Sequence, residues 1–295
     1  MSHFLAPVFE AGFFESEAVH TALIVGTPVA LVAGALGVFT VMRGQSFAAE
    51  AFGDIGTTGG SAAFLVGAAP LPGFLAFGAL AAAAMELVGI QRARGRDLAT
   101  GIVLGAALGL AALFLYLATT IHNTTGAVVT ILFGSIFTVS RSTLPLVAVL
   151  AVAVVAMLLV IHRPLLLSTV NSEIARARGV PVRSVGAAYL LALAVSAALC
   201  ALTIGSILST ALLVGPGAAA LRATRRPGRA FLVAALLALA AMWLGIVLAY
   251  DSYYWPPEGT GWPVSFFVVT IVFMIYLLSG LPAFRERRRS GPASG

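Results

Sequence analysis

The chain has 295 residues, of which 60% are hydrophobic and only 9% are charged, whereas about 25% of the residues in a soluble domain are charged. All 17 basic residues are arginines, and without a lysine the chain excludes a P-loop, whose motif needs a lysine to reach the nucleotide phosphates. Composition therefore predicts an all-α, polytopic membrane protein, which binds no nucleic acid and leaves any ATP hydrolysis to another chain.

Nine apolar runs are long enough to cross about 30 Å of hydrocarbon. They lie near residues 18–42, 46–67, 72–90, 98–119, 143–162, 184–203, 204–222, 230–250 and 264–282. The sixth and seventh runs abut at Thr203–Gly205, where one long helix must be told apart from two. Residues 120–142 are less apolar and contain Phe133-Gly134-Ser135, which predicts a short re-entrant or interfacial segment.

The arginines predict the orientation of these spans. With nine spans and the N-terminus outside, every arginine except Arg141 lies on the cytoplasmic side, in keeping with the positive-inside rule. We therefore expect residues 1–17 to form an extracytoplasmic segment and residues 18–282 to form the transmembrane permease domain. Residues 283–295 are then a basic cytoplasmic tail.

Two carboxylates lie in the second span, where charge is expensive. Glu50 and Asp54 are four residues apart and share one face of a helix. Asp54 lies about 12 Å from the end near Ser46 at 1.5 Å per residue, and an ionised carboxylate there costs at least about 2.5–3.5 kcal/mol. The pair predicts a cation site or gate on a permeation path. The alternative is a pair that neighbouring serines, threonines or protons satisfy.

Three further patterns follow in the second to fourth spans. Gly56–Gly60 reads GTTGG, which predicts a broken helix whose backbone carbonyls become available as ion ligands. Glu86 is close enough to the inner end of the third span to reach an arginine, which favours a structural ion pair. Gly101, Gly105 and Gly109 recur every four residues and predict a face for close helix packing.

The longest cytoplasmic loop, Arg163 to Val185, contains a predicted short amphipathic helix. Ser172–Arg178 begins with residues that start helices, Gly179 is a typical stop signal and Pro181 lies beyond it. Such a helix, lying flat on the cytoplasmic face, suits two roles. It can grip an ATPase partner, or it can connect two spans while resting on lipid headgroups.

Four motifs occur in the order in which one known family carries them. Asn171–Arg183 reads NSEIARARGVPVR, close to the family's DPELARALGVPVR, and Leu132–Ile136 reads LFGSI, close to LFGSIL. Gly205–Ala220 matches a GVLLVxALLxxPAATA-like helix, and Asp97 resembles an acidic residue that opens the fourth span. From about residue 37 to residue 279, the chain thus resembles the metal-type ABC transporter permeases, which take up zinc, manganese or iron.

The resemblance implies that the loop helix is the coupling helix, which docks into the ATPase and converts its closure into movement of the spans. It assigns this role to residues 171–183. Those that carry the contact are Asn171, Ser172, Glu173, Ile174, Ala175, Arg176, Ala177, Arg178, Gly179, Val180 and Pro181.

The second span departs from the family. Where the family has GDALSHAVLPG, with an acidic residue and a histidine implicated in gating or metal binding, Ala49–Gly59 reads AEAFGDIGTTG. Glu50 takes the aspartate position and Asp54 the histidine position, so the resemblance implies that these two residues meet the metal. An all-oxygen pair suits Mn²⁺ or Fe²⁺, whereas nitrogen ligands suit Zn²⁺.

We therefore expect the permease subunit of an ABC importer for a divalent transition metal, in a bacterial cell membrane. The resemblance implies three partners: a cytoplasmic ATPase subunit, an extracytoplasmic metal-binding protein, and a second permease copy or homologue. The metal is cargo, and no permanently bound cofactor is expected. The alternative is an ion-coupled secondary transporter with Glu50 and Asp54 as its coupling carboxylates. An intramembrane enzyme is disfavoured, because no zinc-protease motif or nucleophile constellation occurs.

Overall fold

The structure is a computed structural model that describes residues 13, 15–88, 96–122, 126–134, 136–224, 226–255, 259 and 261–289. These residues contain no strand. Their helices are α1 (Glu17–Met42), α2 (Ser46–Leu65), α3 (Pro70–Val88), α4 (Arg96–His122), α5 (Ala127–Phe133), α6 (Leu144–Val170), α7 (Ser172–Ala177), α8 (Val182–Ile204), α9 (Ser209–Ala223), α10 (Pro227–Asp251) and α11 (Val264–Arg289), with short 3-10 turns η2 (Ile136–Thr138), η3 (Arg141–Thr143) and η4 (Ser252–Tyr254). Ser135 of the LFGSI motif and the side chain of Asp97 lie outside the described residues.

The long helices coincide with the predicted apolar runs. Five segments are long and apolar enough to cross a membrane: Glu17–Met42, Val103–Ile121, Arg141–Val170, Val182–Ile204 and Gly228–Tyr254. The apolar helices Pro70–Glu86 and Val264–Gly280 are shorter, and α2 carries two carboxylates and four glycines. The all-α, multi-pass membrane fold is thus confirmed, while the number of spans stays a prediction.

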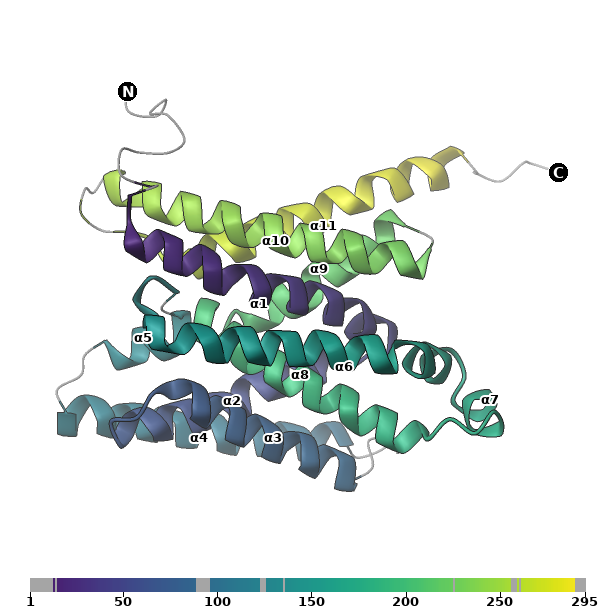
Figure 1. Ribbon diagram of the computed structural model, residues 1–295, viewed down its shortest axis with the longest axis horizontal. Coiled ribbons are helices and arrows are strands. Elements are labelled where there is room, and N and C mark those ends of the chain that lie inside the picture. Colours follow the sequence, from purple (N-terminus) through teal and green to yellow (C-terminus); the bar gives the residue numbers. More distant parts are fainter. Residues whose placement is uncertain are drawn as a thin grey trace.

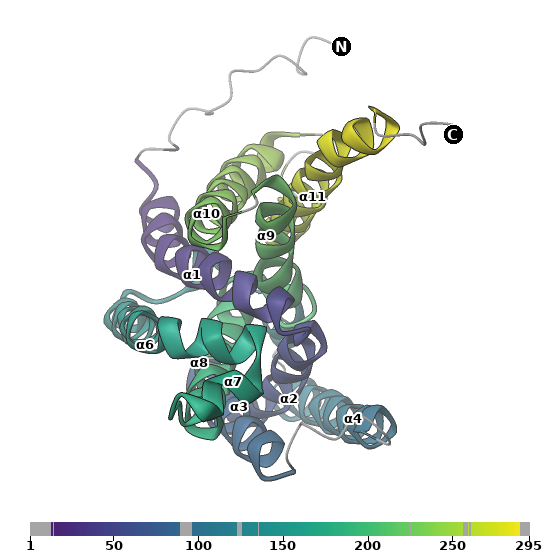
Figure 2. The same cartoon turned by 90° about the vertical axis from the view of Figure 1, so that its right-hand side faces the viewer.

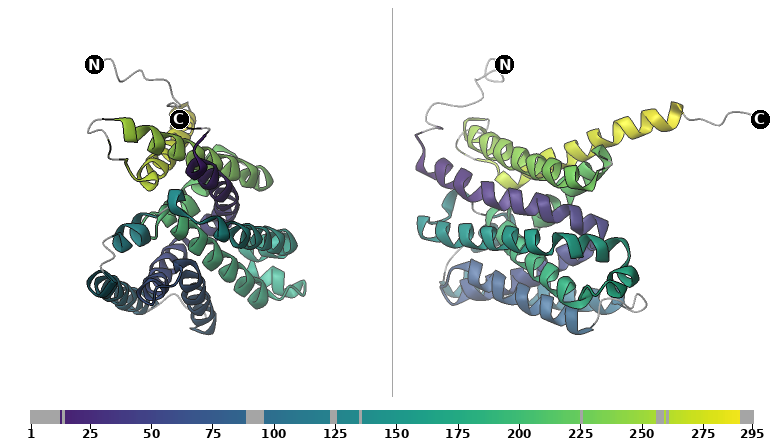
Figure 3. Two further views of the ribbon diagram at one scale, coloured as in Figure 1. Left: turned by 60° about the vertical axis from the view of Figure 1, so that its left-hand side comes forward. Right: turned by 45° about the vertical axis from the view of Figure 1, so that its right-hand side comes forward.

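The helices form three neighbouring groups. Helix α1 packs against α9 and α10, and α10 packs against α11 (Figure 1). Helices α6 and α8 pack against each other and against α1, while α2 packs between α3 and α4. Two further views keep the blue group α2–α4 on the opposite side from the yellow-green group α10 and α11 (Figure 3). Contacts of α8 with α3 join the two sides.

The break between α8 and α9 occurs where the two predicted runs meet. Gly205 ends α8 with a φ of +85°, and Gly134, which ends the short helix α5, has a φ of +80°. The two glycines face each other, because a Cβ on Gly134 would lie 2.5 Å from the Gly205 nitrogen. The Ser206 N–H donates to the Ile131 carbonyl oxygen at 3.2 Å. Helix α5 therefore ends against the α8–α9 break, as part of the short segment expected in residues 120–142.

Helix α6 extends further than predicted. The expected loop from Arg163 begins only after Val170, because α6 continues through Pro164. Proline inside a helix costs one backbone hydrogen bond. Beyond the proline, however, Leu165 is fully buried and Ser168 nearly so. Burial of this last stretch offsets the proline, and it carries α6 up to the residue that caps α7.

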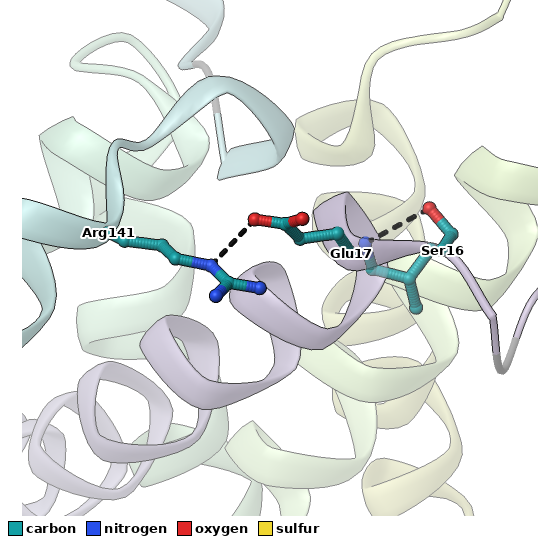
Figure 4. Close-up of polar contacts among 4 residues, drawn as sticks. Ser16, Glu17 and Arg141 are labelled. Carbon is teal, nitrogen blue, oxygen red and sulfur yellow. Dashed lines mark hydrogen bonds and ion pairs between the residues drawn. The ribbon is translucent and has the colours of Figure 1, made fainter.

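The two ends of the molecule carry different arginines. The Arg141 guanidinium pairs with Glu17 at the start of α1, with Nε and Oε1 2.6 Å apart (Figure 4). Arg43 follows the opposite end of α1, and Arg183 at the start of α8 pairs with Glu86 at 3.2 Å. The ion pair predicted for Glu86 is thus confirmed. Arg141 is separated from these arginines, in agreement with the predicted odd number of spans. Which end faces the cytoplasm stays a prediction.

Candidate functional site

The candidate site lies on α2, which is one continuous helix. The predicted break at Gly56–Gly60 is therefore wrong. Gly59 lies so close to α3 that a Cβ there would be 2.1 Å from the Gly73 carbonyl oxygen. The Thr57 hydroxyl donates to the Gly53 carbonyl oxygen at 2.8 Å. Close packing holds the glycines in helical form, so the carbonyls remain within the helix and the side chains must supply any ligands.

Glu50 and Asp54 share one face of α2, as their spacing predicts, and both are half-buried. Within the described part of the chain, neither carboxylate has a hydrogen bond or an ion pair with another residue. Two like charges one helical turn apart repel each other, and burial adds to the cost of ionisation. Among the described residues, no serine or threonine hydroxyl bonds to the pair. A proton on one carboxylate or a cation between the two relieves both costs.

The pair lies between α4 and the start of α9. Thr58 donates its hydroxyl to the Ala107 carbonyl oxygen of α4 at 2.7 Å. On the other flank, a Cβ on Gly53 would lie 3.0 Å from Ser209 Oγ and 3.5 Å from the Ser206 carbonyl oxygen. The carboxylate stripe, the face of α2 that carries Glu50 and Asp54, therefore lies between α4 and the start of α9.

Hydroxyls continue the stripe beyond the carboxylates. Thr57 and Ser61 follow Glu50 and Asp54 at helical spacing, so the four residues occupy one face of α2. Both hydroxyl residues are buried, and the Ser61 Oγ has no hydrogen-bond partner in the structure. Sequence reasoning missed the position of Thr57 on this face, because it assigned the residue to a helix break. The helical spacing of the four residues was the signal that could have found it.

The described residues contain no group of three or more His, Cys, Asp and Glu side chains arranged to hold a metal ion. The cluster at the site consists of two carboxylates with hydroxyl neighbours. Such a set suits transient contact with a cation that must be released, since tight sites close the coordination sphere with more ligands.

Gly105 and Gly109 do not form the predicted packing face with the described helices of the single chain. Both are exposed, and no atom lies within 4 Å of a Cβ placed on either glycine. Helix α4 contacts α2 through another face, which includes Ala107. The burial of Gly101, the third glycine of the predicted face, lies outside what the structure describes.

The loop helix α7 forms as predicted. The Asn171 side chain caps it by accepting from the N–H groups of Glu173 at 2.9 Å and Ile174 at 3.0 Å. Gly179 has a φ of +78° just beyond the end of α7. Residues 171–174, 176–179 and 181 are exposed, whereas Ala175 is fully buried. One small residue thus anchors α7, and almost all of its other residues are exposed. Helix α7 lies toward the viewer in Figure 2.

Removal of the cap is expected to loosen α7. Asn171→Ala leaves the N–H groups of Glu173 and Ile174 without their acceptor, at a cost of about 1 kcal/mol. Hydrogen–deuterium exchange of residues 172–177 should then accelerate about fivefold. Asn171→Asp is the matched control, because it keeps the accepting oxygen and should leave the exchange rate unchanged. An equal rate in Asn171→Ala and the parent protein contradicts the capping role.

The comparisons with known proteins agree with this architecture. The chain is 30% identical over 238 residues to the manganese transport system membrane protein MntC of Halalkalibacterium halodurans, covering 81% of this chain and 77% of that protein. It is 23% identical to the high-affinity zinc uptake system membrane protein ZnuB of Haemophilus influenzae, covering 80% and 90%. A solved structure, PsaBC from Streptococcus pneumoniae in complex with Fab, matches its fold with a TM-score of 0.77 at 22% identity, covering 91% and 93%. The family model of the ABC 3 transport family matches residues 15–280, so the chain belongs to that family.

Proposed function

We propose that this chain is the permease subunit of an ABC importer for a divalent transition metal in a bacterial plasma membrane. A separate ATPase subunit powers it. The observation that carries the proposal is the pair Glu50 and Asp54, which lies half-buried on α2 and has no hydrogen bond or ion pair with any residue that the structure describes. Relatives named for manganese transport and for zinc uptake support the class of cargo.

The ligand set favours manganese or iron among the transition metals. Carboxylates and hydroxyls are hard oxygen ligands, which suit Mn²⁺ and Fe²⁺, whereas a histidine nitrogen suits Zn²⁺. Glu50 and Asp54 attract the ion and contact it briefly as it passes. The hydroxyls of Thr57 and Ser61 lie further along the same face of α2 and can replace water molecules of the hydrated ion.

The exposed helix α7 supports the proposed ATPase contact. Ile174 keeps 48% of its surface exposed although it is apolar, and Arg178 and Arg183 of the same segment are also exposed. Protein interfaces are enriched in arginine and combine an apolar core with a polar rim, so this exposed segment suits a protein contact. In this proposal, residues 171–183 dock into the ATPase. A second permease copy or homologue completes the pathway. An extracytoplasmic metal-binding protein delivers the ion.

Uptake that depends on ATP tests the proposal. Right-side-out vesicles from the native cells should accumulate Mn²⁺ when they contain ATP, and vesicles from a deletion strain should not. Ionophores that collapse the proton and sodium gradients should leave this uptake unchanged. Uptake that needs a gradient and not ATP would instead identify an ion-coupled secondary transporter. Equal accumulation in both strains would exclude Mn²⁺ import by this chain, and parallel assays with Fe²⁺ and Zn²⁺ identify the preferred ion.

A further inference from the structure

Arg43 lies between three helices, outside the site described above. It directly follows the last residue of α1, and its Nε donates to the Gln45 side-chain oxygen at 3.2 Å. Gln45 is the residue that precedes α2. The Nη1 of Arg43 donates to Ser168 Oγ at 3.3 Å and to Thr169 Oγ1 at 3.2 Å. One guanidinium thus holds the start of α2 and the last turn of α6.

A buried tyrosine fixes the guanidinium from the side of α8. The guanidinium carbon of Arg43 lies 5.3 Å from the ring centroid of Tyr189, which is fully buried. The Tyr189 hydroxyl is hydrogen-bonded to Thr40 Oγ1 of α1 at 2.9 Å. Partial burial lowers the pKa of Arg43 from its ordinary value, yet an arginine remains charged at neutral pH. Its charge lies at the carboxyl-terminal ends of α1 and α6, where helix dipoles favour a cation.

These contacts connect the two functional segments of the chain. Thr169 lies two residues before Asn171, which caps α7, and Gln45 lies five residues before Glu50 on α2. A displacement of α7 acts on the last turn of α6, because only Val170 separates that turn from the cap residue. The hydrogen bonds of Arg43 then pass the displacement to the start of α2.

We propose that Arg43 is the positioning residue that couples movement of α7 to the carboxylates of α2, so that ATPase closure and ion passage occur together. This inference rests on the proposed function. Arg43 does not touch the ion; it sets the position of α2 relative to α6. Arginine suits the role, because its planar group makes several hydrogen bonds in fixed directions at once.

The test is the number of Mn²⁺ ions transported per ATP hydrolysed, measured on the assembled permease–ATPase complex in vesicles with its metal-binding protein. Arg43→Gln should lower this ratio at least about fivefold, the lower end of typical couplings between sites. ATP hydrolysis itself should continue. Arg222→Gln is the matched control: Arg222 also stacks on a tyrosine, Tyr276, and donates to its hydroxyl, but it joins α9 to α11. Its ratio should equal that of the parent protein.

A second variant keeps the inference open to test if Arg43→Gln does not fold. Ser168→Ala combined with Thr169→Val removes the two α6 acceptors and leaves Arg43 on Tyr189, and its ratio should also fall. An unchanged ratio in either folded Arg43→Gln complexes or this double variant overturns the role of Arg43. Parent vesicles without ATP-dependent uptake would instead overturn the proposed function, so the two failures are distinguishable.

Discussion

The double variant Glu50→Gln, Asp54→Asn is expected to take up Mn²⁺ at least about tenfold more slowly than the parent protein. The substitutions keep the size of both side chains and remove the two negative charges that attract the cation. Two opposite unit charges 4 Å apart attract each other by about 4 kcal/mol at an effective dielectric constant near 20. A tenfold change needs only about 1.4 kcal/mol. Uptake of radioactive manganese into ATP-loaded vesicles, normalised to the amount of protein, measures the effect.

Glu86→Gln is the control for this variant. It also removes a carboxylate from the α2–α4 group, but Glu86 pairs with Arg183, whose side chain is 81% exposed. Loss of such an exposed pair costs little, so uptake should remain within about twofold of the parent rate. Parent-like uptake by the double variant would exclude the carboxylate pair as the ion site. An equal loss in Glu86→Gln would show a general effect of charge.

The second large effect is expected on folding. Gly59→Val should markedly reduce the yield of folded protein in detergent, because the new side chain meets the backbone of Gly73. Overpacking commonly costs about 1–3 kcal/mol, and here helices α2 and α3 must separate before any side chain fits. The yield of monodisperse protein and the midpoint of thermal unfolding are the measurements.

Gly105→Val makes the same substitution on α4, where no atom lies within 4 Å of a Cβ. Helix propensity changes in the same way at both positions, so the difference between the two variants isolates the close approach of α2 and α3. Gly105→Val should unfold near the temperature of the parent protein. Similar losses in both variants would contradict a specific contact at Gly59.

Much of the fold could be predicted from local patterns. Apolar length located the long helices, and Gly205 located the break between α8 and α9. Asn171 and Gly179 correctly predicted the limits of α7. The spacing of Glu50 and Asp54 placed them on one helix face, since that relation depends only on 3.6 residues per turn. Each of these features depends on residues that are near one another in the sequence.

Glycine marked the limit of such reasoning. The same residue permits a helix to break or to approach a neighbour closely, and only the partner helix decides between the two. At Gly59 the partner is Gly73, and the helix continues; at Gly105 no partner lies among the described residues of the single chain. The contacts of Arg43 with Ser168 and Tyr189 span more than a hundred residues of sequence, so no local pattern could predict them.

The facing pair Gly134 and Gly205 joins two motifs that read as separate in the sequence. A Cβ on Gly205 would lie 2.1 Å from the Leu132 carbonyl oxygen, and a Cβ on Gly134 would lie 2.5 Å from the Thr203 carbonyl oxygen. Because of these clashes, neither glycine can acquire a side chain while the other segment keeps its path. Both glycines also have a positive φ, which other residues rarely adopt. The two motifs therefore form one structural unit, and a larger residue at either glycine requires the other segment to move.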